Sequence, residues 1–551
     1  MKKKQLRWTL WTIASPFILF IILCILIYLP PIQNFLVDKA AVYASEATGM
    51  NISVGRISLS FPLNLVVTDV DAASPHKDTL LSVRRLQVNV QLLPLLKKQV
   101  EVDGISLQGA TVNSNDLIHG MKLNGTLGEL FISSHGVALD PETAIVNKVL
   151  LKDTDLSLCL NDTAAADTAA SDTTYWKIIL QDIDLQNVSF ALDMPLDSLS
   201  LAASLDNATL RDGLIDLHKS AYSLQTFRIE NGRVRYDNGK PLAADSLSSG
   251  LDPSHIALTD IGVKLDSLYY GGRNMKAIIS QFVLKERSGV EIVSATGRMV
   301  SNDKVLRVPS LKLETRDSYL ELNAAMDWNA LDFKDEGLVS ARLMADIGKP
   351  DVVRFMGSMD EKFIRKYPSE PLRIRTGIDG DLNKLKLTTL TAELPGALEL
   401  FAKGELTSLT DSLLRGGDIT LQAETKDLKF ISTLAEGIEI PYGTRLEGKF
   451  TMAGPKMGTD LLLMQPEAHA VAAADTIPIT VYNDSISVAD DFKMERAARL
   501  FAKYDLSRDR YEADLAVNHF DLHQFMPADS LYALSTRLKA VSYTHLTLPT
   551  T

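Results

Sequence analysis

The chain has 551 residues, a net charge of −12 and only two cysteines. This length exceeds what one compact core supports and predicts several domains or one extended repeat. The negative charge argues against nucleic acid or an anionic membrane surface as the main partner. Because Cys24 lies in an apolar stretch and Cys159 stands alone beyond it, no intrachain disulfide is expected, which favours a bacterial envelope protein over a secreted animal one.

The first predicted element is a membrane anchor within residues 1–31. Residues 8–29 carry no charged side chain, and four cations between Lys2 and Arg7 precede them. As a helix this stretch would be about 33 Å long, enough to cross a hydrocarbon core of about 30 Å. The cations predict a cytoplasmic N-terminus, so the rest of the chain is expected in the periplasm. The predicted anchor residues are Leu10, Trp11, Phe17, Ile18, Leu19, Phe20, Ile21, Ile22, Leu23, Ile25, Leu26, Ile27 and Leu29.

A cleaved signal peptide is the alternative for this stretch. Such a peptide has an apolar region of about 7 to 15 residues and a cleavage site of small residues. Here the apolar run is longer and ends in Tyr28-Leu29-Pro30-Pro31, without an Ala-x-Ala sequence nearby. The sequence therefore favours an uncleaved, single-pass anchor in the bacterial inner membrane.

Beyond the anchor, the spacing of apolar residues changes from helical to alternating. Residues 32–49 have roughly helical spacing and a stop at Gly49, which predicts a short amphipathic helix. After it, alternation with a period of two recurs as far as residue 517, which predicts antiparallel strands with one apolar face. The predicted segments are a β region at 50–162, a flexible loop at 163–174, a β region at 175–345, a β region with short helices at 346–540, and a tail at 541–551.

Weak internal repeats lie within these β regions. Residues 105–112, 183–190 and 227–234 share the spacing of their apolar positions, with Gly or Asn at the fifth position. This spacing predicts a strand, a tight bend at the Gly or Asn, and a returning strand. Helix-like interruptions are predicted near 350–366 and 427–436.

The apolar face of such a sheet needs a cover, and two arrangements would provide one. In the first, the strands form a string of closed sandwiches or barrels, which periodicity alone slightly favours. In the second, an open curved sheet lines a groove for an apolar ligand. The candidate groove-lining residues are then Ile57, Leu59, Phe61, Leu63, Leu65, Val67, Leu86, Val88, Val90, Ile105 and Leu107.

The sequence offers little catalytic chemistry. Gly443–Phe450 is one residue away from a phosphate-binding loop, but Phe450 stands where the loop needs Ser or Thr. His519 and His523 are four residues apart without the glutamate of a zinc-protease helix. Cys159 lies in an apolar run and is predicted to be a packed thiol. We therefore predict a protein without catalytic residues, metal ligands or a cofactor, and not an enzyme.

Several short segments fall in an order found in one family of envelope proteins. They are Pro30-Pro31 after the anchor, Thr48-Gly49, Ile52–Ile57, Phe61-Pro62-Leu63, Asp78–Leu81 and Val102–Leu107. In their spacing and order the first 115 residues resemble the start of the AsmA/TamB family. Residues 255–330 and 498–527 resemble more diffusely the TamB branch (translocation and assembly module) of Bacteroides-type bacteria.

This resemblance implies an inner-membrane anchor and a long periplasmic β-groove with an apolar interior, with few helices. It implies phospholipid passage toward the outer membrane, or assembly of outer-membrane proteins with a β-barrel partner. The C-terminal domain that defines the TamB branch is not recognisable, and residues 541–551 resemble translated adapter sequence. We therefore expect the sequence to be truncated at its C-terminus, and contact with a barrel partner would belong to the missing region.

Overall fold

A computed structural model describes most of the predicted periplasmic region. The described residues are 42, 45, 50–60, 64–74, 79–91, 102–114, 121–138, 142–160, 176–239, 250–332, 337–356, 360–434, 437–465, 497–527 and 533–541. The predicted anchor at 1–31 lies outside them, as do nearly all of the predicted helix at 32–49, the loop at 163–174, Phe61 and Leu63. Within the described ranges, no helix is both long enough and apolar enough to span a membrane.

The described chain is mainly β, as predicted. Its 25 strands are assigned to one sheet, and helices are short and few. The chain divides into two compact units. Unit 1 comprises Met1–Leu242, Asp252–Gly272 and Ala277–Arg287, and unit 2 comprises Ala243–Leu251, Arg273–Lys276 and Ser288–Thr551.

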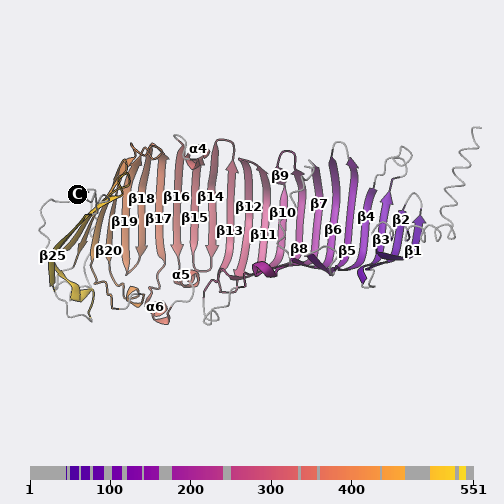
Figure 1. The fold of residues 1–551 in the computed structure, drawn as a ribbon, viewed down its shortest axis with the longest axis horizontal. Helices are drawn as coiled ribbons and strands as arrows, with labels where there is room; N and C mark the ends of the chain where they lie inside the picture. Colours follow the sequence, from indigo (N-terminus) through magenta and orange to yellow (C-terminus); the bar gives the residue numbers. More distant parts are fainter. Residues whose placement is uncertain are drawn as a thin grey trace, which may run out of the picture. The chain divides into compact units, whose positions relative to one another are not determined.

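In unit 1 the strands pair largely in chain order (Figure 1). The strands are β1 (Asn51–Ser60), β2 (Asn64–Ala73), β3 (Thr79–Val90), β4 (Val102–Asn113), β5 (Met121–Ala138), β6 (Thr143–Leu160), β7 (Lys177–Met194), β8 (Leu199–Asp216), β9 (Ala221–Leu224), β10 (Thr226–Asp237), β11 (His255–Gly271) and β12 (Asn274–Glu286), with a 3-10 turn η1 (Pro195–Asp197). Strand β10 pairs with β8 and β11, and the short β9 pairs with the same two strands.

One pair in unit 1 departs from the predicted antiparallel pattern. Strands β6 and β7 run parallel, with Thr143 opposite Lys177 and Cys159 opposite Asp193. A parallel pair needs a crossover connection, whereas antiparallel neighbours can be joined by a tight turn. The prediction of a wholly antiparallel structure is therefore wrong at this point.

Unit 2 is an antiparallel meander in which each strand pairs with the next (Figure 1). Its strands are β13 (Glu291–Ser301), β14 (Val305–Thr315), β15 (Tyr319–Asp327), β16 (Leu338–Ile347), β17 (Leu372–Asp381), β18 (Lys384–Leu394), β19 (Leu398–Thr407), β20 (Gly416–Thr425), β21 (Arg445–Ala453), β22 (Lys456–Met464), β23 (Ala497–Asp505), β24 (Arg510–Asp521) and β25 (Ala533–Val541). Its helices and 3-10 turns are α4 (Trp328–Leu331), α5 (Lys349–Met356), α6 (Glu361–Lys366), η2 (Ile431–Thr433) and η4 (Leu522–Gln524). Helices α5 and α6 confirm the predicted interruption near 350–366, and the described residues of the one near 427–436 contain the 3-10 turn η2.

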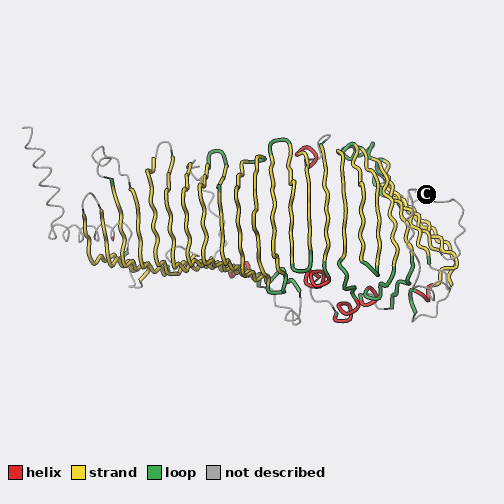
Figure 2. Tube along the Cα trace, turned by 180° about the vertical axis from the view of Figure 1, so that it is seen from behind, coloured by secondary structure: helices red, strands yellow, loops and turns green. Residues whose placement is uncertain are grey.

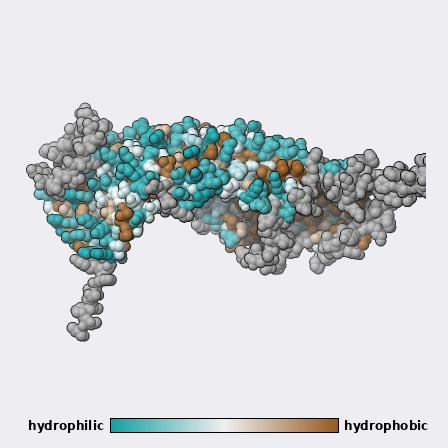
Figure 3. Space-filling view, turned by 90° about the horizontal axis from the view of Figure 1, so that it is seen from above, coloured by the Kyte–Doolittle hydropathy of each residue, from teal (hydrophilic) through white to brown (hydrophobic). Residues whose placement is uncertain are grey.

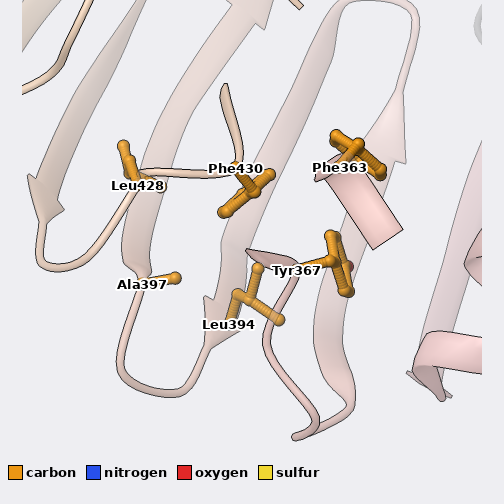
Figure 4. Close-up of a cluster of buried hydrophobic side chains, with 6 residues drawn as sticks. All are labelled: Phe363, Tyr367, Leu394, Ala397, Leu428 and Phe430. Atoms are coloured by element: carbon orange, nitrogen blue, oxygen red, sulfur yellow. The ribbon is translucent and has the colours of Figure 1, made fainter. Parts of the chain in front are cut away.

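The tightest apolar packing in unit 2 lies at strand ends. The rings of Phe363, Tyr367 and Phe430 contact one another with centroids 5.1 to 5.7 Å apart. Figure 4 shows these rings with Leu394 at the end of β18 and Leu428 beyond β20. This cluster packs at the turns that join the strands, and the faces of the strands carry other side chains.

Candidate functional site: an apolar face on each unit

The register of unit 1 aligns apolar side chains into rows that cross the strands. Residues directly opposite each other in neighbouring strands point to the same face of a sheet. Following the pairs from β1 to β11 gives four parallel rows, which we number from first to fourth. The fourth row is apolar at every position. It consists of Leu59, Leu65, Val88, Ile105, Ile132, Val149, Ile183, Leu210, Phe227 and Leu265.

Three further rows run alongside the fourth and contain no charged side chain. The third row is Ile57, Val67, Leu86, Leu107, Leu130, Leu151, Leu185, Ala208, Ile229 and Val263. The second row is Val54, Val70, Val83, Ala110, Leu127, Thr154, Val188, Leu205, Gly232 and Ile261. The first row is Ile52, Ala72, Leu81, Val112, Gly125, Leu156, Phe190, Ala203, Val234 and Leu258.

Eight of the eleven candidate groove-lining residues fall in two of these rows. The third row contains Ile57, Val67, Leu86 and Leu107, and the fourth contains Leu59, Leu65, Val88 and Ile105. Val90 lies at the end of β3. Phe61 and Leu63 lie outside the described residues. The structure thus brings the described candidates from four strands onto one face.

A row of polar, charged and glycine residues separates the second row from the third. This row, which we call the crease, is Gly55, Asp69, Arg84, Gly109, Gly128, Asp153, Asn187, Asp206 and Asn231, each set between aligned pairs of the two rows. Five of its members have a left-handed backbone: Asp69, Gly109, Asp153, Asn187 and Asn231, with φ between 48° and 63°. Such a residue in a strand is typical of a bulge, which adds one residue and bends the strand.

The crease corrects one prediction made from the repeats. Gly109, Asn187 and Asn231 are the fifth positions of the three repeated segments, and each does bend its strand. The chain does not return there, however, because β4, β7 and β10 each continue through the bend. The repeat therefore marks a shared fold line across neighbouring strands instead of a series of hairpins.

The apolar face is on the concave side of this bend. Beside the crease, Val83, Ala110 and Ala208 are at most 5% exposed, although no described second layer covers them. The crease side chains Asp69 and Asn187 are exposed. Figure 2 shows the strands of unit 1 turning at one level, and Figure 3 shows brown, apolar residues in the shaded recess to the right.

A hollow of about 350 Å³ lies at the first row, where β6, β7, β8, β10 and β11 contribute its lining. Leu156, Phe190, Ala203, Val234 and Leu258 of that row contribute to its lining. Ala203 is much smaller than its neighbours Phe190 and Val234, which leaves space between their side chains. Phe190 remains 38% exposed, so this part of the face is accessible.

Unit 2 carries apolar rows of the same kind across its thirteen strands, β13 to β25. One that crosses all thirteen is Gly297, Leu311, Leu322, Leu343, Thr376, Leu390, Ala402, Leu421, Gly448, Leu461, Leu500, Leu515 and Leu538. A neighbouring row includes Ile419 and Phe450, and Phe450 is 42% exposed. The row from Gly297 to Leu538 contains no charged side chain, so it continues without interruption from β13 to β25.

The opposite face of unit 2 carries the charges. Arg499 donates two hydrogen bonds to Asp460, of 2.8 and 2.6 Å, from Nε and Nη2. Arg537 makes the same bidentate interaction with Asp514, donating from Nε and Nη2. Each of these residues lies between two members of the apolar rows in its strand and so points to the other face. Cross-strand ion pairs of this kind stabilise the sheet while one face stays free of charge.

The sequence features that suggested chemistry do not assemble into a site. Gly448 and Phe450 lie within β21, which follows β20, so the context is strand to strand as predicted. His519 is in β24 and His523 in η4. Cys159 is half-buried in β6. Among the described residues, no group of three or more acidic, His or Cys side chains is arranged to hold a metal ion.

Sequence reasoning missed most of the apolar face. Strands β5 to β11 supply more than half of the third and fourth rows, including Leu130, Leu151 and Leu185. Their alternation is visible in the sequence, but alignment between strands depends on register, which the repeat at 105–112, 183–190 and 227–234 would have indicated.

No protein-family model matches this sequence, and no curated protein is significantly similar to it.

Proposed function

We propose that this chain is an inner-membrane-anchored periplasmic protein of AsmA/TamB type, which carries phospholipid along an apolar β-groove toward the outer membrane. The observation that carries the proposal is the unbroken fourth row, in which ten strands contribute an apolar side chain at one level. The predicted anchor and the resemblance of the first 115 residues support the location. The scarcity of catalytic motifs supports a non-enzymatic role.

The dimensions of the rows suit an acyl chain. Neighbouring strands are about 4.8 Å apart, so an extended chain of about 20 Å would contact some four or five residues of one row. Each methylene group removed from water contributes about 0.8 kcal/mol. Successive positions along a row are chemically alike, so the chain can move from strand to strand without leaving an apolar environment. The charged head group would remain in water at the open side.

Site-specific photo-crosslinking of the full-length chain in its own membranes tests this proposal. A photoreactive phenylalanine analogue at Leu107 is expected to form adducts with phospholipid that mass spectrometry identifies. The same analogue at Ser106, the preceding residue of β4 and on the opposite face, is the matched control. A second variant with Leu65→Asp and Val88→Asp, which places two charges side by side in the fourth row, should abolish the adduct at Leu107. Equal adducts at both positions, or none at Leu107, would contradict the proposal.

A second candidate function is a scaffold for assembly of outer-membrane proteins with a β-barrel partner. The observation that favours it is strand β25, the last described strand, which pairs with β24 and exposes Leu534 and Leu538 by 38% and 59%. Exposed strands can template pairing with another chain. This role predicts that Lys539→Pro in β25 impairs assembly while charges in the fourth row are tolerated. The lipid-carrier role predicts the reverse.

A further inference from the structure

The crease of unit 1 is built by a repeated chemical device. The crease residues with a left-handed backbone are all Asp, Asn or Gly. These residue types adopt this conformation most readily. Two of them also donate hydrogen bonds across strands: Asn187 Nδ2 donates to Asp153 Oδ1 at 2.9 Å, and Asn231 Nδ2 donates to the carboxylate of Asp206. The bend is therefore held at the same level in consecutive strands.

The crease also preserves the apolar face. From β1 to β8, the second and third rows are three residues apart in each strand, as with Val54 and Ile57 or Val188 and Leu185. Without the extra residue, alternation would turn one of these rows to the opposite face. The bulge thus bends the strand and keeps both rows on the concave side, where they meet as a corner.

We propose that this corner is the track along which the ligand lies, and that the crease residues Asn187 and Asn231 are positioning residues that hold it open. This inference rests on the proposed lipid-carrying function. A chain in the corner contacts the second row on one side and the third row on the other, whereas a chain on a flat part of the face contacts one side only. A chain in the corner is therefore shielded from water on two sides.

The side chains at the corner fit a slender ligand. Several members of the second row are small, namely Val83, Ala110, Thr154 and Gly232, and Ala208 occupies the facing third row in β8. These small residues are already buried, so the surface left for a ligand belongs to larger, half-buried members of the two rows, such as Leu127, Leu130 and Val188. An extended acyl chain is slender enough to lie along this half-buried surface between the two rows.

Unit 2 has no comparable crease among its described residues. Its left-handed non-glycine positions are Ser408, Asp509 and His519, of which only His519 lies within a strand. We therefore expect the track to be sharply defined in unit 1, and the ligand to be less confined on the rows of unit 2.

The experiment uses the full-length chain with the photoreactive analogue at Leu151 in the corner or at Leu158 near the end of β6, seven residues away. The expected result is a lipid adduct at least threefold stronger at Leu151 than at Leu158. Asn187→Val with Asn231→Val should reduce the Leu151 adduct at least threefold, because a β-branched residue is disfavoured in the left-handed conformation. Asn187→Gly with Asn231→Gly, which permits that conformation, should restore it.

The matched control is Gln186→Val with Glu230→Val, the exposed residues directly before the two asparagines, which should leave the adduct unchanged. Spin labels at Gln181 and Ala191 of β7, in a background without native cysteines, report the bend independently of lipid. Their separation should increase in the Asn→Val variant and stay constant in the control.

The outcomes separate this inference from the proposed function. Equal adducts at Leu151 and Leu158 would overturn the track while leaving lipid carriage intact. An undiminished Leu151 adduct in the Asn→Val variant, with the label separation increased, would do the same. No adduct at either position in the unmodified chain would overturn both.

Discussion

Gly128 of β5 faces Asp153 of β6 across the crease, and a Cβ placed on Gly128 would lie 2.8 Å from the Cβ of Asp153. It would also lie 2.9 Å from the Asp153 carbonyl oxygen. The left-handed backbone of Asp153 turns its side chain toward the neighbouring strand, so that strand must carry glycine at this level. The same relationship holds between Gly55 and Asp69, where the corresponding distance is 2.9 Å.

We predict that Gly128→Val destabilises unit 1 by about 1 to 3 kcal/mol, the usual cost of forcing extra atoms into a closely packed position. The midpoint of urea unfolding measures this change. Asn124→Ala, at an exposed position of the same strand, is the control and should change stability by less than about 0.5 kcal/mol. A Gly128→Val protein as stable as the control would show that the crease relaxes easily.

In unit 2 we predict that a single charge interrupts the long apolar row. Leu390→Asp places a carboxylate between Thr376 and Ala402, on the face where no neighbour can pair with it. A lipid adduct formed at Leu421, two strands further along, should fall at least threefold. Thr389→Asp puts the same charge on the exposed opposite face and should leave that adduct intact. Equal effects of the two substitutions would argue against the row as a ligand path.

The aromatic cluster at the strand ends of unit 2 predicts a different kind of effect. Phe430→Ala removes a ring that packs edge-on against both Phe363 and Tyr367. Loss of a buried aromatic side chain typically costs about 3 to 5 kcal/mol. Phe430→Ala should therefore lower the midpoint of thermal unfolding of unit 2. Because the cluster lies at the turns and not on the apolar rows, lipid adducts in unit 1 should persist at temperatures where unit 2 remains folded. Lys429→Ala, at the exposed preceding residue, is the control, and calorimetry is the measurement.

Much of this fold could be predicted from alternation alone. The period of two places Leu59, Leu65 and Val88 on one side of their strands, and the structure aligns them in one row. Alternation carries no information about which strands pair, so the parallel arrangement of β6 and β7 was not predicted. Periodicity also did not distinguish closed sandwiches from a single sheet, because both bury alternate residues.

The candidate site shows the same limit. Asn187 and Asn231 were recognised as bends, since these residue types favour turns. Their alignment with Asp69 and Asp153 appears only when the strands are in register, because a fold line is a property of neighbours across the sheet. A bulge and a hairpin start with the same residue types, and only the direction of the chain after the bend distinguishes them.

Acid sensitivity is predicted at the start of β11, where the buried His255 lies between two carboxylates of unit 1. Its Nδ1 is 2.8 Å from Asp252 Oδ2, and its Nε2 is 3.6 Å from Asp237 Oδ1. The hydrogen bond from His255 lowers the pKa of Asp252, and the backbone N–H of Ser254 lowers it further. A carboxyl group whose folded pKa is depressed stabilises the fold above its unfolded pKa, about 3.9, and that stability is lost as the pH falls through the folded pKa.

Asp252→Asn should therefore flatten the dependence of unfolding free energy on pH below about pH 4, where protonation of Asp252 in the unfolded chain begins to favour unfolding. At neutral pH the variant should be less stable than the unmodified protein, because the charge-assisted bond to His255 is lost. Urea unfolding at pH 3 to 7 measures both effects. Asp212→Asn, at an exposed position of β8, is the control and should keep the acid slope. An unchanged slope in Asp252→Asn would mean that other carboxyl groups carry the acid sensitivity of unit 1.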